Sequence, residues 1–513
     1  MTRSRTQKAS LNIVTSVSLQ IVSIISGLII PRYILQFFGS SYNGIVSSAT
    51  QFMSLISILT LGVTASTRAA LYKTLAKNDI AKTSAIVRAT ERYMRKIGLI
   101  LGGYIIVLAA VYPLLVKTGF QYWDVALLIL IVGMSAFAEY FFGITYQTFL
   151  LADQCVYISN LFSCIACLLN IVISLVLISA GYGIHVVYFG SAVVYVLRPL
   201  LQNIYVTRKY KLDKHCAPDS SALKKRGDAM MHALSNIVHD NTDIVILTLF
   251  TDVKIVSIYT IYNLVMSALK KIQAIFTTGT EPIFGNMWAR GEKGSIKKNL
   301  GVFEYFVDSF NAVAFSIAMV MVLPFVALYV PQNVNDINYI RPAYAIVISL
   351  AFATQGMRVP YLALVQGIGH YKETRNAAIT EAVINLGVSV VLVNIIGLVG
   401  VAIGTLAANL YRTFHYAIYI EKHVVVRGKY VFIKKFLWTM LNMVCIVVPS
   451  RIVVQQLSIA SWSQWVLVSC GVCIYACSVL FVMSMLFYRE DLKYAVNVAM
   501  RMFLKKTRKS KLS

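Results

Sequence analysis

The feature that most constrains this chain is a succession of about fourteen long apolar runs separated by short gaps. A run of about 20 apolar residues is long enough to cross the hydrocarbon core of a bilayer as a helix. Most of the 47 Lys and Arg residues lie in every second gap. Because basic loops stay on the cytoplasmic side, the pattern also predicts orientation. We therefore expect an all-α, multi-pass inner-membrane protein of about fourteen transmembrane helices, with both termini in the cytoplasm.

Composition excludes several classes of protein. With 58% hydrophobic and 13% charged residues, the chain is not an ordinary soluble globule. The net charge of +26 belongs mostly to the predicted cytoplasmic loops, so it indicates contact with anionic lipid headgroups rather than with nucleic acid. Most of the eight cysteines lie inside apolar runs without a matching histidine cluster, so we expect no disulfide, metal site or cofactor. No P-loop is present, which excludes an ATP-binding module in this chain.

The apolar runs predict where the helices lie. We expect them at 10–38, 42–66, 97–117, 121–150, 156–180, 183–206, 231–250, 253–285, 299–326, 343–367, 376–396, 398–420, 431–450 and 464–488. Basic inner segments include 67–96, 286–299 and 421–435, and the longest outer loop lies near 327–342. No segment is long enough for a compact extramembrane domain. The chain is therefore not expected to be an enzyme.

An internal repeat predicts how the helices are grouped. The segment around Asn170 resembles the segment around Asn385, and each continues through a Gly-containing turn to an arginine, Arg198 or Arg412. Two lobes of six helices, related by a pseudo-twofold axis along the membrane normal, would explain this repeat. Such lobes form transporters that work by alternating access. The expected domains are an N-terminal lobe, a basic cytoplasmic linker, a C-terminal lobe, two extra helices and a basic cytoplasmic tail, at 1–206, 207–230, 231–420, 431–488 and 489–513.

Cations inside the apolar runs are the first candidates for a functional site. Arg198, Arg358 and Arg412 lie at a similar depth in three predicted helices. Lys270 and Lys271 lie deeper, and only one of them is expected to face inward, because adjacent helical residues point about 100° apart. Clustered arginines suit phosphate, which a guanidinium binds bidentately. The alternative is that an acid on a neighbouring helix neutralises each cation, for which the candidates are Glu139, Asp243, Glu281, Asp308 and Glu381.

Polar residues elsewhere suggest coupling or gating. His239 and Asp243 share one face of a predicted helix and could titrate in a proton-coupled cycle. Glu281 and Glu381 are further candidates for the same role. Glu281 stands directly before a proline, and Arg358 stands two residues before Pro360. Proline breaks helices, and broken helices are common where transporters build their binding sites.

Glycines near the start of one predicted helix allow two interpretations. Gly397, Gly400 and Gly404 superficially resemble a nucleotide-binding fingerprint. They lie, however, at a helix start in an apolar segment, and Gly400 and Gly404 form the pattern GxxxG. Two glycines spaced in this way let a second helix approach closely. We therefore expect close helix packing here.

The opening segment adds a family resemblance. It reads GLIIPRYILQFFGSSYNG and is followed by LISILTLGVTASTRAALYK. These segments, and the later DIVILTLFTDVKIVSIYTIYN, resemble bacterial polysaccharide flippases, the O-antigen and capsule repeat-unit exporters of the multidrug/oligosaccharidyl-lipid/polysaccharide (MOP) superfamily. The resemblance covers essentially the whole chain, although its motifs are loose.

The resemblance implies a function and one further residue. The family moves an undecaprenyl-diphosphate-linked oligosaccharide from the cytoplasmic to the outer leaflet, with a proton or Na⁺ as a possible coupling ion and other polysaccharide-assembly proteins as possible partners. Related peptidoglycan-precursor flippases carry an arginine in helix 1 before an FG turn, and Arg32 matches it. An aspartate follows in those relatives, whereas Tyr33 follows here. The expected cargo-binding residues are thus Arg32, Arg198, Lys270, Arg358 and Arg412.

Two other functions stay open at this point. A multidrug/cation antiporter of the same superfamily would need a buried acid in helix 1 or a predominantly acidic cavity. Helix 1 contains no acid. A membrane-embedded polysaccharide polymerase or ligase would be expected to carry a large outer loop with catalytic residues, and the predicted outer loops are short.

Overall fold

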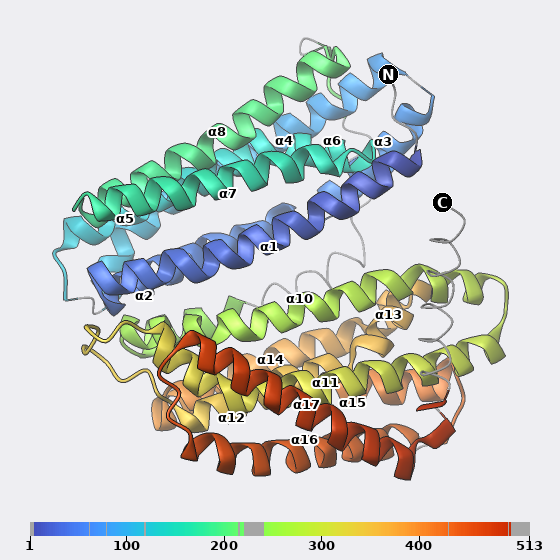
Figure 1. Cartoon of the computed structure of the whole chain (residues 1–513). Helices are drawn as coiled ribbons and strands as arrows, with labels where there is room; N and C mark the ends of the chain where they lie inside the picture. The colour runs from blue at the N-terminus through green and yellow to red at the C-terminus, as the bar shows by residue number, and fades with distance from the viewer. Residues whose placement is uncertain are drawn as a thin grey trace, which may run out of the picture. The chain divides into compact units, whose positions relative to one another are not determined.

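The computed structural model describes residues 5–60, 62–77, 79–116, 119–213, 216–219, 241–428, 430–490 and 492–493. Within these ranges every regular element is helical (Figure 1). Among the described residues, ten helices are long and apolar enough to cross a membrane. The prediction of an all-α, multi-pass membrane protein is confirmed, while the total of fourteen spans and the side on which the termini lie stay predictions.

Contacts divide the chain into two compact units. The first unit comprises Met1–Thr260 with Val330–Ile337, and the second comprises Ile261–Tyr329 with Asn338–Ser513. The boundary therefore lies inside one long helix, α10 (Val253–Ala289). Lobes of six equivalent helices stay a prediction, and each unit is described by itself.

The first unit is a bundle of long helices. Its helices are α1 (Arg5–Phe38), α2 (Ser40–Ser54), α3 (Val63–Ala76), α4 (Ile80–Leu115), α5 (Tyr122–Ala138), α6 (Ile144–Ala152), α7 (Val156–Ser179), α8 (Ile184–Tyr210) and Asn241–Phe250. In this bundle α1 packs on α7, α7 packs on α8, and α5 packs between α4 and α8. Buried side chains such as Leu101, Leu128 and Ile129 form its core.

Two predicted helices of this unit are not continuous α-helices. The run predicted at 42–66 divides into α2, a 3₁₀ segment (Leu55–Thr60) and α3. Gly62 precedes α3 with a φ of 78°, a left-handed conformation that glycine adopts readily because it lacks a Cβ atom. The run predicted at 121–150 contains one π-helical turn, Glu139–Gly143, between α5 and α6. Such turns are rare and frequently lie at functional sites.

The described part of the second unit contains the rest of α10 and seven further helices. These are α11 (Lys293–Tyr329), α12 (Pro342–Met357), α13 (Val359–Ile368), α14 (Tyr371–Ile396), α15 (Leu398–His423), α16 (Val431–Gln456) and α17 (Trp462–Phe487). Helix α15 packs against α12 and α14, while α16 and α17 both pack on α11. The run predicted as one helix at 343–367 is broken at Arg358, two residues before Pro360.

The GxxxG pattern packs two helices of this unit closely. A Cβ atom at Gly400 would lie 2.8 Å from the Cβ of Leu392, and one at Gly404 would lie 2.8 Å from the backbone nitrogen of Ser389. Both neighbours belong to α14, so the glycines of α15 let the two backbones approach. The sequence-based prediction of close helix packing is confirmed.

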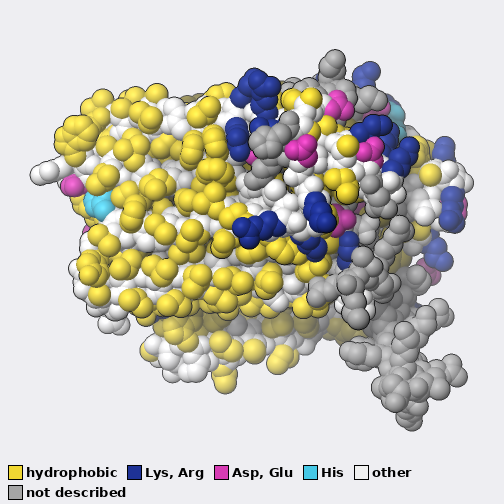
Figure 2. All heavy atoms as spheres, turned by 90° about the horizontal axis from the view of Figure 1, so that it is seen from above, with side chains coloured by type: hydrophobic (Ala, Val, Ile, Leu, Met, Phe, Trp, Pro, Cys, Tyr) yellow, Lys and Arg dark blue, Asp and Glu magenta, His cyan; other side chains and the backbone are white. Residues whose placement is uncertain are grey.

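The surface has the distribution of charge expected in a bilayer. Figure 2 shows one face, which is hydrophobic over most of its length and carries Lys and Arg gathered toward one end. Many large apolar side chains are exposed, among them Leu130, Phe189 and Leu467. Lipid would cover such residues in a membrane.

Candidate functional site

Two predicted cargo-binding arginines of the second unit meet at one carboxylate. Arg358 lies at the break between α12 and α13, and its Nη1 donates to Oε1 of Glu381 on α14. Arg412 on α15 places its Nε 3.9 Å from Oε2 of the same carboxylate. All three side chains are at least nine-tenths buried. From the sequence alone, Glu381 had two possible roles, as one of five acids that could neutralise a membrane arginine and as a coupling or gating group.

Arg412 has hydrogen-bond donors that no acceptor satisfies. Its Nη2 donates to the Tyr416 hydroxyl over 2.7 Å, and its Cζ lies 4.4 Å from the centroid of that ring. Its Nε and Nη1 are buried and have no hydrogen-bond partner. A buried charged donor without an acceptor is costly, so this guanidinium is poised to accept an anionic group.

Neutral polar side chains hold the helices around this arginine. Thr413 donates to the carbonyl oxygen of Thr354 over 3.0 Å, which joins α15 to α12. The Asn409 amide donates to the carbonyl oxygen of Ala351, also over 3.0 Å. Asn385 donates to Thr405 over 3.1 Å and joins α14 to α15. These bonds fix the helices that carry Arg412 and Glu381.

The first unit holds Arg198 in a separate ion pair. Its Nη2 donates to Oε2 of Glu139, and its Nη1 donates to Ser163 over 3.2 Å. Glu139 begins the π-helical turn, and a Cβ atom at Gly143 would lie 3.0 Å from both Glu139 and Pro199. The irregular turn therefore brings the carboxylate against α8. Arg198 and Glu139 each keep about a fifth of their side-chain surface exposed.

The remaining predicted site residues differ in their burial. Arg32 and Lys270 are half-buried in α1 and α10, and each takes part in interactions of its own, while Lys271 is exposed. Glu281 is half-buried in α10. Asp243 is buried and accepts a hydrogen bond from the Tyr259 hydroxyl over 3.4 Å. His239 lies outside the described residues.

The sequence left open whether acids neutralise the membrane arginines. The structure places a carboxylate beside Arg198, Arg358 and Arg412. Of the five acids considered, Glu139 and Glu381 fill this role. Each of these arginines therefore has an acid beside it, so the three do not form a purely cationic cluster. Arg412 differs from Arg198 and Arg358 because its contact with the carboxylate is the longest of the three, at 3.9 Å.

Sequence reasoning missed a second buried charge network in the second unit. Arg427 donates to both carboxylate oxygens of Glu304 and, over 3.1 Å, to Glu421. Lys435 donates to Glu304 over 2.7 Å. Arg427 and Lys435 belong to a segment predicted as a basic cytoplasmic loop. The available signal was Glu304 itself, an acid inside a long apolar helix.

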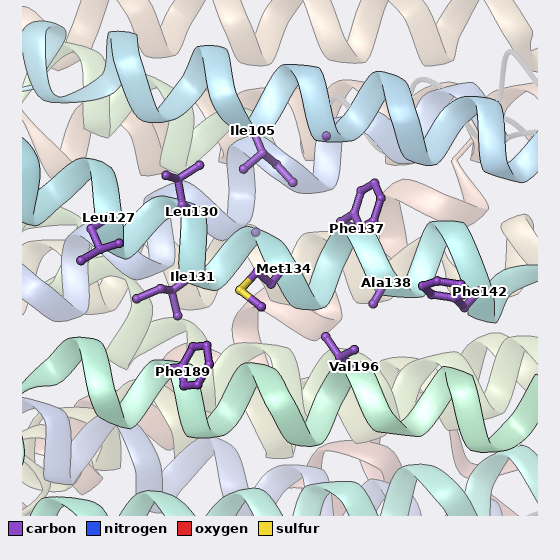
Figure 3. A pocket seen from close by; sticks show the side chains of 12 residues that line it. Ile105, Leu127, Leu130, Ile131, Met134, Phe137, Ala138, Phe142, Phe189 and Val196 are labelled. Atoms are coloured by element: carbon purple, nitrogen blue, oxygen red, sulfur yellow. The ribbon is translucent and has the colours of Figure 1, made fainter.

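A groove in the first unit is suited to lipid rather than to a diphosphate. It has a volume of about 590 Å³ and lies between α4, α5 and α8. Figure 3 shows its apolar lining, which includes Ile105, Met134, Phe137 and Phe189. Because its lining exposes almost no polar atoms, the groove cannot pair with a charged headgroup.

Comparisons with known proteins agree on the fold. No family model and no curated protein matches the sequence. A structure of the lipid II flippase MurJ in an inward closed conformation aligns with a TM-score of 0.72 at 14% identity, over 93% of this chain and 99% of that one. An inward-facing multidrug resistance MATE family transporter of the MOP superfamily aligns with a TM-score of 0.59 at 14% identity, over 83% of this chain and 95% of that one.

A MATE protein in complex with MaD3S aligns with a TM-score of 0.53 at 15% identity, over 85% of this chain and 95% of that one. At such low identity the likeness establishes architecture and leaves cargo open. It extends over nearly the full length of each neighbour. The chain therefore has the fold shared by the lipid II flippase MurJ and the MATE transporters of the MOP superfamily.

Proposed function

We propose that this protein is a flippase that moves an undecaprenyl-diphosphate-linked oligosaccharide from the cytoplasmic to the outer leaflet of the bacterial inner membrane, for surface polysaccharide biosynthesis. The observation that carries the proposal is the buried guanidinium of Arg412, whose Nε and Nη1 have no hydrogen-bond partner. The fold supports it, because one of the similar structures is a lipid II flippase.

The chemistry of the cargo matches this residue. A diphosphate presents several anionic oxygens, and a guanidinium binds such oxygens through charge-assisted hydrogen bonds. Arg412 lies fourteen residues after the start of α15, or about 21 Å along the helix, which corresponds to the interior of a bilayer. A headgroup that crosses the membrane needs a cation at this depth. We assign Arg358 and Arg198 to supporting roles on the same route, with Arg32 and Lys270 as further contacts.

Coupling to an ion is part of the proposal. Asp243 and Glu381 are buried acids in separate units, and a proton or Na⁺ could exchange at either. Glu281 and His239 stay further candidates for this role. Other polysaccharide-assembly proteins are the expected protein partners, since the product must be polymerised or attached after it crosses.

The rival proposal is a drug/cation antiporter, because the fold is also similar to that of a multidrug resistance MATE family transporter. A cation cargo would require an acid with unsatisfied acceptors. The unsatisfied charged groups in the part of the chain that the structure describes are instead guanidinium nitrogens of Arg95, Arg198 and Arg412. This observation favours an anionic cargo.

The decisive experiment combines two measurements. Deletion of the gene should cause lipid-linked oligosaccharides to accumulate, and mass spectrometry of their headgroups would identify the cargo. Arg412→Gln should reproduce this accumulation at wild-type protein levels on a membrane immunoblot, whereas Arg290→Gln, an exposed arginine beyond α10, should not. Unchanged lipid-linked intermediates in the deletion strain would refute the proposal.

A further inference from the structure

A second groove lies in the second unit, where α16 begins and α17 ends. It has a volume of about 400 Å³ and is bounded by the start of α16 and the end of α17. Leu437, Leu441 and Phe487 supply an apolar wall, and all three are largely exposed. Tyr430 and Tyr488 also line it, and tyrosine is enriched where membrane proteins meet the headgroup layer.

The length of this groove corresponds to one leaflet. Its lining runs from Tyr430, directly before α16, to Leu441, ten residues into that helix. At 1.5 Å per residue the distance from Tyr430 to Leu441 is about 16 Å, or about half of a hydrocarbon core. The part of an acyl chain nearest its headgroup therefore fits along it.

The lining of the groove includes a cation. Lys434 lines it, is exposed, and places its Nζ 6.0 Å from the centroid of the Tyr488 ring. Arg489 follows Tyr488 directly and is also exposed. The groove of the first unit has no charged residue in its lining. The two grooves thus differ in the charge of their lining, and charge is the property that selects a lipid headgroup.

We propose that the α16–α17 groove binds an anionic phospholipid of the surrounding bilayer. The phosphate pairs with Lys434, and one acyl chain lies along Leu437, Leu441 and Phe487. The charge of Lys434 is complementary to the headgroup, and the apolar wall suits the part of the acyl chain nearest to it. This inference does not depend on the proposed transport function.

Lipid titration of the purified full-length protein in detergent would test the proposal. Phosphatidylglycerol should raise the thermal unfolding midpoint by several degrees, because a ligand that binds only the folded state stabilises it. Phosphatidylcholine with the same acyl chains should raise it much less. Lys434→Gln should remove most of the difference between the two lipids and leave the lipid-free midpoint unchanged. Lys298→Gln, an exposed lysine of α11 outside the groove lining, is the matched control and should retain the difference.

Leu437→Trp provides an independent variant, because its larger ring would fill the groove. It should weaken the retention of phosphatidylglycerol in native mass spectrometry, while Lys298→Gln should not. Three results would overturn the proposal: equal stabilisation by both lipids, an equal loss in Lys434→Gln and Lys298→Gln, or displacement of phosphatidylglycerol by an isoprenyl phosphate. The last result would identify the groove as a site for the cargo tail.

Discussion

Arg427 and Glu304 form a bidentate ion pair, in which Nη1 and Nη2 of the arginine each donate to a different oxygen of the carboxylate. The arginine lies in the connection between α15 and α16, and the acid lies in α11. Lys435 of α16 donates to the same carboxylate over 2.7 Å. Glu304 therefore fastens the helix pair α16–α17 to the body of the second unit. The two last helices are attached through buried charge as well as through apolar packing.

We expect Glu304→Gln to destabilise the protein strongly. The substitution leaves Arg427 and Lys435 buried with one carboxylate fewer, and breaking a buried pair in this way costs about 3–5 kcal/mol. Lys82→Gln is the control, because its ion pair with Asp79 is exposed and should contribute less than about 1 kcal/mol. Unfolding of the purified variants in detergent would measure both. Equal stability of the two variants would contradict the assigned role of Glu304.

The shared carboxylate of Glu381 leads to a second prediction. Glu381→Gln removes the acceptor of Arg358 and the nearest acid to Arg412, so it should cost about 3–5 kcal/mol. Arg412→Gln leaves the Arg358–Glu381 pair intact and should cost about 1–2 kcal/mol. Unfolding midpoints in detergent would rank the two variants. A larger loss in Arg412→Gln would show that this arginine is mainly structural, which would weaken its assignment to cargo binding.

Much of the fold could be predicted, because the bilayer imposes length and hydropathy on each helix. The run predicted at 156–180 is α7 (Val156–Ser179), and the run at 464–488 is α17 (Trp462–Phe487). Pro360 also marked the region where α12 and α13 separate. These features are local, so a single stretch of sequence contains the information that determines them.

The pairing of charges could not be predicted in the same way. Arg427 and Glu304 are 123 residues apart, and nothing local distinguishes Arg427 from the other cations of its loop. The π-helical turn at Glu139 is equally hidden, because its formation depends on contacts with α4 and α8. The sequence selected Arg198, Arg358 and Arg412 together because they lie at a similar depth in their predicted helices. Only tertiary structure shows that Arg412 keeps uncommitted donors.

Close packing of α14 and α15 gives a third prediction. Gly404→Ala would place a Cβ atom 2.8 Å from the backbone nitrogen of Ser389, so it should cost about 1–3 kcal/mol through overpacking. Gly387→Ala is the matched control on α14, since a Cβ atom there meets nothing within 4 Å. This control should be neutral or should stabilise the helix by up to about 1 kcal/mol. Thermal midpoints that fall equally in both variants would argue against close packing at Gly404.

Cys155 gives a prediction about chemical reactivity. It lies between two candidate spans, is 2% exposed, and donates a hydrogen bond from its thiol to Asp153 over 3.0 Å. Burial raises the pKa of the Cys155 thiol, and the hydrogen bond to Asp153 raises it further. The reactive thiolate is therefore scarce near neutral pH and becomes more abundant only as the pH rises.

Single-cysteine variants would measure this reactivity with a maleimide. The variant that retains Cys155 should react at least about tenfold more slowly at pH 7 than the variant that retains the half-buried Cys216, because both burial and the raised pKa of Cys155 oppose attack. Its rate should increase toward alkaline pH, since a raised pKa moves the thiolate fraction in that direction. Asp153→Asn removes the negative charge beside the sulfur, so it should lower the pKa of the Cys155 thiol. The increase in rate should then begin at a lower pH. Equal rates for Cys155 and Cys216 at pH 7 would show that the turn at Cys155 is open to solvent.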